Sequence, residues 1–450
     1  MVALSPPPSP GRPDRLPHFC ALRVLRACAA AAASVLATTA IAGAPANTFN
    51  LPQLIEQAER GNKDLQAARY AIDIGRARLV QAGLRPNPTL DLSGRSDFLF
   101  NNEGEYDVAI ALKQEFPVAG RILRQKDVAR VDIALAEMEV AEAERKLADD
   151  IAGKVYRLLV SQRKEGSLGS IIVAEEKLLK TSRARFRAAE VSELDVNTVQ
   201  LDLQRLGMDR ALLDDEQQAL TGALNILLGR DAGTALTVLE PLPESRPLPG
   251  LAQLEHLALQ QRPDLQAALL GVDRAAAEKA LARSLRWQDW RVGLELAQDK
   301  QAILGAPEQG VDRSIGVSVS IPLPVFNKGQ GLIAEADANR DQSLARVEAL
   351  RASIRGELAG AHAQATRLQA ALARFGEGAS PISARNIRLA RQGYDMGLVP
   401  VFDVVQAQRQ QSELDKAYVE TLDQFLQALV RLNTAAGNYS SHPLGPSRQP

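Results

Sequence analysis

An internal duplication constrains the fold of this 450-residue chain more than any other feature of its sequence. The pentapeptide Asp-Leu-Gln-Ala-Ala occurs at residues 64–68 and again at 264–268, and Pro117 and Pro324 each precede a valine. Matching residues are slightly further apart in the sequence at the Pro-Val dipeptides than at the pentapeptides, so an insertion lies between these two places. A long internal repeat indicates one structural unit that is used twice, and insertions in repeats fall in loops. We therefore expect two similar units that complete their core against each other.

The duplication also predicts the domain boundaries. We expect the first repeat at residues 47–229 and the second at 251–437. The segment between them, residues 230–250, is rich in proline and glycine and is predicted to be a linker. Residues 438–450 contain three prolines and are expected to form a flexible tail.

The N-terminal segment, residues 1–46, has the pattern of an export signal. Several arginines precede a run of small apolar residues at 27–42. The triplet Ala40-Ile41-Ala42 fits a signal-peptidase cleavage site, and Ala44-Pro45-Ala46 is a second candidate. The apolar run is shorter than the about 20 residues that a membrane-spanning helix needs. We therefore predict a cleaved signal peptide rather than a membrane anchor.

Residue types that bind metals or carry out catalysis are sparse. Both cysteines, Cys20 and Cys28, lie in the predicted signal peptide, so the mature chain is expected to have neither a disulfide nor a thiolate metal site. The four histidines are far apart in the sequence, whereas a metal site needs three or four converging ligands. No catalytic constellation stands out. We predict no enzyme activity, no cofactor and no tightly bound metal.

The composition favours long helices. Charged residues make up 24% of the chain and aromatic residues only 4%, while alanine and leucine are abundant. Such a profile is typical of long helices with coiled-coil-like packing. The net charge of −1 and the lack of a basic stripe with interleaved aromatic residues argue against a nucleic-acid partner.

Two very long helical stretches are predicted, one in each repeat. From Ile122 to about Ala188 there is no proline, and apolar residues recur at spacings of three and four. This pattern indicates an amphipathic helix packed on other helices, and about 65 residues would form a rod of roughly 100 Å. The second stretch begins near Gly329 and is interrupted around residues 376–381 before it resumes. Shorter helices are expected before the strands of the two repeats, at residues 51–84 and 251–285.

Four short segments alternate strictly between apolar and polar residues: 89–97, 106–116, 289–298 and 313–323. A period of two predicts β-strands with one apolar face and one polar face. Two interpretations remain open at this point. The segments could form hairpins on a soluble core, or they could span a membrane with the apolar face in lipid and the polar face toward a lumen.

The membrane interpretation has a consequence for assembly, because four strands are too few to close a barrel. An open sheet edge in a bilayer leaves backbone groups unpaired, and each unpaired group costs several kcal/mol. Two chains would supply eight strands, whose barrel interior is filled by side chains, whereas twelve strands from three chains leave room for an aqueous lumen. If the strands span a membrane, we expect a homotrimer as the smallest assembly with an open pore.

Several local phrases identify a family resemblance. Arg-Pro-Asn-Pro at 85–88 precedes the first strand, Gln-Glu-Phe-Pro at 114–117 follows the second, and Ser-Ile-Pro-Leu-Pro-Val-Phe at 320–326 follows the fourth. The two helix-to-helix turns, at 186–196 and 394–404, match as well. Over essentially the whole mature sequence, the chain resembles the TolC-type outer-membrane efflux proteins. The phrases at 190–196 and 322–327 are most similar to the heavy-metal, cobalt-zinc-cadmium branch of that family.

The resemblance implies a mostly helical α+β membrane protein built from two tandem repeats of helix, β-hairpin, long helix and helix. Three chains would form a homotrimer with a twelve-stranded β-barrel in the outer membrane, joined to a long α-helical barrel in the periplasm. The implied partners are a periplasmic adaptor, also called a membrane fusion protein, and an inner-membrane RND-type pump, together with outer-membrane lipid.

The two helix-to-helix turns are the predicted contact with the adaptor. By the resemblance, they lie at the periplasmic tip of the helical barrel, and glycine at 397 is expected to end its helix in a left-handed conformation. The alternative is a plain helical hairpin with no binding role. The predicted contact residues are Ala189, Glu190, Val191, Ser192, Met396, Gly397, Leu398 and Val399.

The resemblance further implies that Tyr394 and Asp403 lie at the pore aperture, and Asp195 is a third candidate. In a trimer, Asp195 and Asp403 would present a ring of carboxylates, which favours cations. Each aspartate also has a purely structural alternative, since Asp195 fits a capping box and Asp403 lies near a helix start. The chain departs from the best-known family pattern at Val399, where an arginine can lock the gate, and at Gln406, where a second aspartate can occur.

We therefore predict a passive outer-membrane channel of a tripartite efflux system that conducts divalent heavy-metal cations. The same duct could instead serve drugs, organic solvents or type I secretion. A periplasmic adaptor or coiled-coil scaffold is an alternative from a different class. The four amphipathic strands and the two helical units argue against it.

Overall fold

The computed structural model describes most of the chain beyond the predicted signal peptide. The described residues are 48–99, 104–243, 247–302, 305, 307 and 309–437. The predicted signal peptide and the predicted flexible tail lie outside these residues. In the described part of the chain, no helix combines the length and the apolar character needed to cross a membrane.

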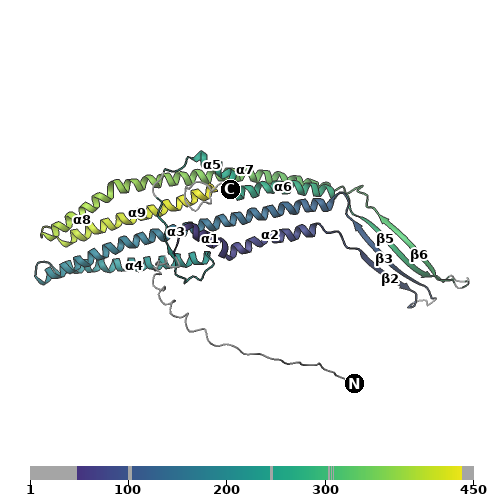
Figure 1. Ribbon diagram of the computed structural model, residues 1–450, viewed down its shortest axis with the longest axis horizontal. Coiled ribbons are helices and arrows are strands. Elements are labelled where there is room, and N and C mark those ends of the chain that lie inside the picture. The colour runs from purple at the N-terminus through teal and green to yellow at the C-terminus, as the bar shows by residue number, and fades with distance from the viewer. Residues whose placement is uncertain are drawn as a thin grey trace, which may run out of the picture. The chain divides into compact units, whose positions relative to one another are not determined.

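The elements follow one another in the same order in the two halves of the chain (Figure 1). The first half contains β1 (Thr48–Phe49), α1 (Leu51–Gly61), α2 (Lys63–Ala82), β2 (Thr89–Ser96), β3 (Tyr106–Phe116), α3 (Arg121–Arg187) and α4 (Glu193–Leu227). After β4 (Thr237–Val238), the second half contains α5 (Leu251–Gln261), α6 (Pro263–Ser284), β5 (Trp290–Lys300), β6 (Asp312–Ser320), α7 (Gln330–Arg374), the π-helix η1 (Phe375–Ala379), α8 (Ser380–Asp395) and α9 (Val401–Ala435). The predicted mostly helical α+β architecture is confirmed, and the division into two repeats with a linker stays a prediction.

The helices expected at residues 51–84 and 251–285 are each broken into two. The first break is at Asn62, whose backbone is extended. Its side chain caps α2 by accepting a hydrogen bond from the amide of Leu65 (2.8 Å). The second break is at Arg262, which is extended because it precedes Pro263. The prediction of one continuous helix at each of these two places was therefore wrong.

The two long helical stretches are present near their predicted bounds. α3 is an uninterrupted helix of 67 residues. Its counterpart is divided, because α7 passes into η1 at Phe375 and continues as α8. The interruption coincides with Gly376, Gly378 and Pro381, and π-turns of this kind accommodate an extra residue within a helix.

The four longer strands form one antiparallel sheet in the order β2-β3-β5-β6. Its register aligns apolar residues in rows across all four strands, for example Leu92, Ile110, Leu296 and Ile315. The opposite face carries small and polar side chains, which include the ion pair of Lys113 with Asp91 (2.7 Å). The sheet is thus apolar on one face and polar on the other, as the alternation predicts.

The bounds of three strands differ slightly from the prediction, and β2 ends at Ser96, one residue before its predicted end. β5 extends to Lys300, two residues beyond the predicted end, and β6 ends at Ser320 rather than at 323. The earlier end of β6 follows from Pro322, because proline has no amide to donate to the ladder.

The long helices lie side by side in layers (Figure 1). At the end far from the sheet, α4 packs on α3, α3 on α9 and α9 on α8. At the end next to the sheet, α2 packs on α3, α3 on α6 and α6 on α7. In both layers the outer members come from opposite halves of the chain, α4 and α8 in one case and α2 and α7 in the other.

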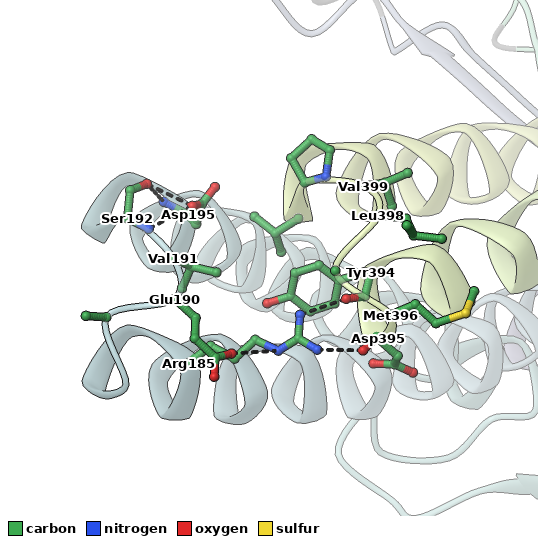
Figure 2. A pocket seen from close by; sticks show the side chains of 14 residues that line it. Arg185, Glu190, Val191, Ser192, Asp195, Tyr394, Asp395, Met396, Leu398 and Val399 are labelled. Carbon is green, nitrogen blue, oxygen red and sulfur yellow. Dashed lines mark hydrogen bonds and ion pairs between the residues drawn. The ribbon is translucent and has the colours of Figure 1, made fainter.

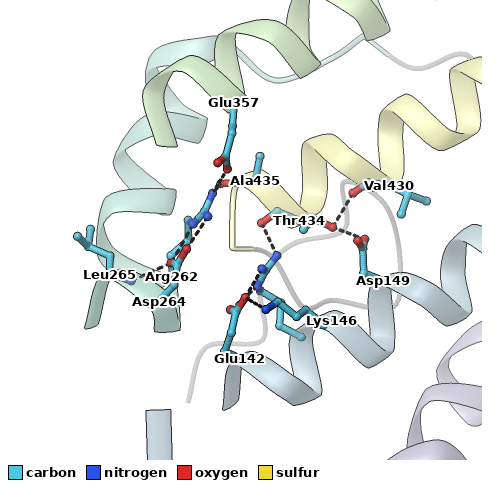
Figure 3. Close-up of polar contacts among 11 residues, drawn as sticks. Glu142, Lys146, Asp149, Arg262, Asp264, Leu265, Glu357, Val430, Thr434 and Ala435 are labelled. Carbon is cyan, nitrogen blue, oxygen red and sulfur yellow. Dashed lines mark hydrogen bonds and ion pairs between the residues drawn. The ribbon is translucent and has the colours of Figure 1, made fainter. Parts of the chain in front are cut away.

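Two buried arginines hold the C-terminal end of α9 at the level where the layers meet (Figure 3). Arg145 donates to the carbonyl of Thr434 (3.2 Å), and Arg262 donates to the carbonyl of Ala435 (3.3 Å). Arg262 also binds Asp264 (2.6 Å) and Glu357 (2.8 Å). Cationic donors at a helix C-terminus satisfy its free carbonyls and interact favourably with the helix dipole.

The pKa values of two carboxylates at this junction are shifted in opposite directions. Burial raises the pKa of Asp149, although its hydrogen bond with the Thr434 hydroxyl acts against that change. Burial would also raise the pKa of Asp264, but the hydrogen bonds and charge of Arg262 outweigh it and hold the pKa below its usual value. Asp264 therefore stays paired with Arg262.

Candidate functional site

The first helix-to-helix turn joins α3 to α4. After α3 ends at Arg187, Ala189 takes a left-handed backbone conformation with φ of 59°. The amide of Ala189 donates to the carbonyl of Phe186 (2.9 Å), and the amide of Glu190 donates to the carbonyl of Arg185 (2.9 Å). These two bonds form a Schellman motif, which satisfies the free carbonyls at the end of α3.

The second turn joins α8 to α9 and has the same backbone geometry. After α8 ends at Asp395, Gly397 is left-handed with φ of 75°. The amide of Gly397 donates to the carbonyl of Tyr394 (2.9 Å), and the amide of Leu398 donates to the carbonyl of Gly393 (2.8 Å). The predicted left-handed helix end at Gly397 is confirmed.

The two turns differ in how the next helix begins. At α4, the hydroxyl of Ser192 accepts a hydrogen bond from the amide of Asp195 (3.2 Å), and the Asp195 carboxylate accepts one from the amide of Ser192 (3.0 Å). This is the capping box that the sequence predicts. At α9, Pro400 occupies the N-cap position, and no side chain caps the helix there.

Both turns line one open hollow of about 670 Å³ at this end of the helices (Figure 2). Asp195 and Tyr394 contribute to its wall, whereas Asp403 is not among the lining residues. All eight residues predicted for adaptor contact line it: Ala189, Glu190, Val191, Ser192, Met396, Gly397, Leu398 and Val399. The structure therefore brings the two predicted segments together into a single surface.

Arg185 joins the first hairpin of helices to the second across this hollow (Figure 2). Its guanidinium donates to the carbonyl of Tyr394 (2.7 Å) and to the carbonyl of Asp395 (3.0 Å). It also lies over the Tyr394 ring, 4.4 Å from the ring centroid, and Glu190 is 3.9 Å away. Arg185 thus caps the end of α8 from the end of α3.

Tyr394 is buried within the single chain, with 3% of its surface exposed. Its hydroxyl is 3.1 Å from the hydroxyl of Ser182 on α3. Its ring packs in an apolar cluster with Leu179, Val196, Val199, Val401, Val404 and Val405. In this arrangement Tyr394 ties α8 to α3, and its hydroxyl does not face open space.

Asp195 and Asp403 occupy different environments. The carboxylate of Asp195 is half-buried and held by its capping bonds, one of which comes from the Ser192 hydroxyl (2.8 Å). Asp403 is exposed in the first turn of α9, and its amide donates to the carbonyl of Pro400 (3.2 Å). A carboxylate at that place also gains from the helix dipole.

Exposed apolar side chains surround the hollow. Leu398 and Met396 expose 73% and 67% of their surfaces, although each is a large apolar residue. Leu194 and Phe402, which the sequence reasoning did not single out, are exposed in the first turns of α4 and α9 but do not line the hollow. Apolar side chains gathered on an open surface mark a binding site more often than a plain turn.

The described part of the chain offers no group of three or more His, Cys, Asp or Glu side chains that could hold a metal ion.

The sequence reasoning did not identify Arg185 as a residue of this site. A cation in the last turn of a long helix was a usable signal, but its targets are more than 200 residues away in the sequence.

Comparison with known proteins gives a consistent assignment. Residues 254–438 match the family described as Outer membrane efflux protein. The chain is 26% identical to the cobalt-zinc-cadmium resistance protein CzcC of Cupriavidus metallidurans, over 87% of this chain and 91% of that protein.

Solved structures share the fold. The chain CusC superimposes with a TM-score of 0.69 at 17% identity, over 86% of this chain and 91% of CusC. The open state of the Neisseria gonorrhoeae outer membrane channel MtrE gives a TM-score of 0.65 at 18% identity, over 88% of this chain and 91% of MtrE. The resemblance predicted from the sequence is thereby confirmed.

Proposed function

We propose that this chain, which is similar to outer-membrane efflux proteins, is a duct that conducts divalent heavy-metal cations out of the cell. It would do so passively, as the channel subunit of a tripartite system that also contains a periplasmic adaptor and an inner-membrane RND-type pump. The similarity to CzcC supports the metal cargo.

The observation that carries the channel proposal is the exposed apolar face of the sheet. Leu92, Ile315 and Val317 each expose at least 70% of their surfaces, and they lie in rows that cross strands from both halves of the chain. A soluble chain would cover such rows, whereas lipid covers them without cost. The polar face then lines the lumen.

Assembly follows from the edges of the sheet and of the helical layers. β2 and β6 are the outer strands, and the outer helices α2, α4, α7 and α8 continue the same two edges. One edge therefore belongs wholly to the first half of the chain and the other to the second half. Joining the two unlike edges of neighbouring copies closes a ring, and a homotrimer supplies the twelve strands of an open barrel.

Matched apolar stripes support this head-to-tail closure. On α4, the exposed residues Leu194, Leu201 and Met208 are spaced by seven, and on α8 the exposed residues Ile382 and Leu389 have the same spacing. A seven-residue repeat is the spacing of helices that pack as coiled coils. We assign these two stripes to the seam between neighbouring copies.

The hollow between the two turns is the proposed adaptor contact. It combines exposed apolar side chains, Met396 and Leu398, with the polar groups of Glu190 and Ser192. Protein interfaces likewise combine apolar contacts with polar groups that stay accessible to water.

The aperture proposal assigns different roles to the three residues. Exposed Asp403 would provide a ring of carboxylates that attracts cations, with Asp195 as a second contributor that is partly occupied by its capping bonds. Tyr394 would act by holding the second turn in place rather than by facing the ions, since its ring is buried.

Fractionation and electrophoresis test the duct itself. We expect the protein in the outer-membrane fraction, and an unheated gel should show a band of about three times the chain mass. A soluble monomer would contradict the proposal.

Planar-bilayer recording tests the aperture. Asp403→Asn should lower the preference for cations over anions. Asp215→Asn removes an exposed carboxylate of α4 that is far from the turns, and it should leave this preference unchanged. Equal selectivity in the wild type and Asp403→Asn would remove Asp403 from the aperture.

A gene-deletion strain tests the cargo. Loss of tolerance to zinc, cobalt or cadmium, restored by the wild-type gene, is the expected result. Sensitivity to drugs or solvents without metal sensitivity would overturn the metal assignment while leaving the duct intact.

A further inference from the structure

An unpaired carboxylate lies in the middle of the helical layer next to the turns. Glu175 of α3 is fully buried, with 0% of its surface exposed. Neither of its two carboxylate oxygens has a hydrogen-bond partner within the described part of the chain. An ionised carboxylate in such a place is costly unless it is paired, and a buried acid without partners is normally neutral.

The charged groups that face Glu175 come from each neighbouring helix. Asp202 projects from α4, Arg391 from α8 and Arg409 from α9. Arg409 is already engaged, because its Nε donates to the carboxylate of Asp202 (2.8 Å), and Arg205 approaches the same carboxylate (3.9 Å). Asp202 is itself 3% exposed, so the Asp202–Arg409 pair is a buried link between α4 and α9.

The position of this cluster connects it to the turns. Glu175 is one helical turn from Leu179, and Asp202 is one turn from Val199. Leu179 and Val199 belong to the apolar cluster that holds Tyr394. The charged layer therefore lies directly behind the packing that fixes the α8–α9 turn.

We propose that Glu175 is a proton-operated latch for this helix end, neutral in the packed arrangement described above and ionised when α3, α4, α8 and α9 loosen around it. Ionised Glu175 repels Asp202 and competes with it for Arg409, which weakens the link between α4 and α9. The inference rests on the proposed duct function for its biological meaning, but not for its test.

The direction of the pH effect follows from the environment. Burial, followed by the like charge of Asp202, raises the pKa of Glu175 from 4.5 to about 7, while Arg391 and Arg409 act in the opposite direction. The packed state therefore holds a proton that the loosened state releases between these two values. Packing is favoured at acidic pH and weakens as the pH rises toward 7. Between pH 5 and pH 8 the ratio of loosened to packed helix ends rises by up to about 70-fold.

Hydrogen exchange on the full-length trimer in detergent measures this ratio. Backbone amides of residues 394–404, corrected for the intrinsic pH dependence of exchange, should lose protection between pH 5 and pH 8 in the wild type. Glu175→Gln should keep the protection of the acidic state at both pH values. The matched control is Glu176→Gln, which removes the exposed neighbouring carboxylate and should behave as the wild type does.

A second variant tests the direction of the coupling. Asp202→Asn removes the repelling charge and frees Arg409 for Glu175, so the midpoint of the transition should move to lower pH. A wild type with constant protection, or a Glu175→Gln variant that keeps the pH response, would overturn the latch. Absence of ion conductance from a well-folded trimer would instead overturn the duct, and the exchange result would still decide the latch.

Discussion

Replacement of Arg185 with methionine tests whether this residue holds the second turn in place. Methionine keeps much of the apolar stem but removes both hydrogen bonds to the carbonyls of Tyr394 and Asp395 and the contact with the Tyr394 ring. Hydrogen bonds from a charged donor contribute about 1.5–3 kcal/mol each, and a cation–π contact contributes about 1 kcal/mol.

The net effect is smaller than the sum of these contributions. The three contacts share one side chain, and 21% of that side chain is exposed, so water replaces part of what is lost. We expect a loss of about 2–3 kcal/mol in the docking of the turn. This corresponds to a roughly 30- to 150-fold increase in its open population.

Hydrogen exchange of residues 396–400 in the purified trimer measures this population directly. Arg185→Met should exchange faster than the wild type by the factor given above, and Arg185→Lys should lie between them, because an ammonium group can serve a carbonyl but lacks the planar fork. Arg187→Met is the matched control, since Arg187 is exposed in the same helical turn. If Arg185→Met and Arg187→Met exchange at the same rate, Arg185 does not hold the turn.

Two further substitutions test the fold with internal controls. Gly229 has a φ of +70°, and Gly229→Ala would place a Cβ 2.1 Å from the carbonyl oxygen of Gly61, so it should destabilise the protein by about 3 kcal/mol or more. Gly166→Ala, in the open middle of α3, should instead stabilise the protein by about 0.5–1 kcal/mol. Thermal unfolding followed by circular dichroism distinguishes the two variants. Val317→Lys on the apolar face of β6 should cost about 2–4 kcal/mol and deplete the trimer band of the outer-membrane fraction on an unheated gel, whereas Ser318→Lys on the polar face should be tolerated. Equal trimer levels in the two lysine variants would contradict the assignment of the faces.

The sequence was sufficient to predict the strands and long helices because their signals are local and repeated many times. In β6, alternation over Ile315, Val317 and Val319 marks one face, although the predicted end at 323 overlooked Pro322, which stops the ladder earlier. The helix break at Arg262 carried a usable signal as well, since the residue before a proline avoids the helical conformation. The break at Asn62 also carried a local signal in the adjacent Gly61 and Asn62, but the apolar spacing continues across it.

The arrangement of the site could not be predicted to the same degree, because it depends on contacts between distant segments. The burial of Tyr394 requires Ser182 and Arg185, which belong to the other half of the chain. Glu175 stands in a Glu-Glu-Lys sequence that is typical of a solvated helix face, and only its spacing of four from Ile171 and Leu179 distinguishes it locally from Glu176. Only the packing of four helices makes one of these carboxylates buried and the other exposed.

The two turns share a backbone geometry but differ in what maintains it, and this difference determines which of them can move. The first turn contains a left-handed alanine, which costs about 1–2 kcal/mol, and it is followed by a capping box that fixes the start of α4 with local bonds. The second turn has a left-handed glycine and no side-chain cap on α9, and the carbonyls at its entry are held by Arg185 from the other hairpin.

The first turn is thus maintained by its own residues, whereas the second depends on contacts with α3. The same dependence applies to Tyr394, whose hydroxyl partner Ser182 is also on α3. Any change that loosens α3 from α8 and α9, whether at Arg185 or at the buried Glu175, therefore releases the second turn first. Movement at this end of the duct should begin in residues 394–404 while residues 188–195 keep their structure.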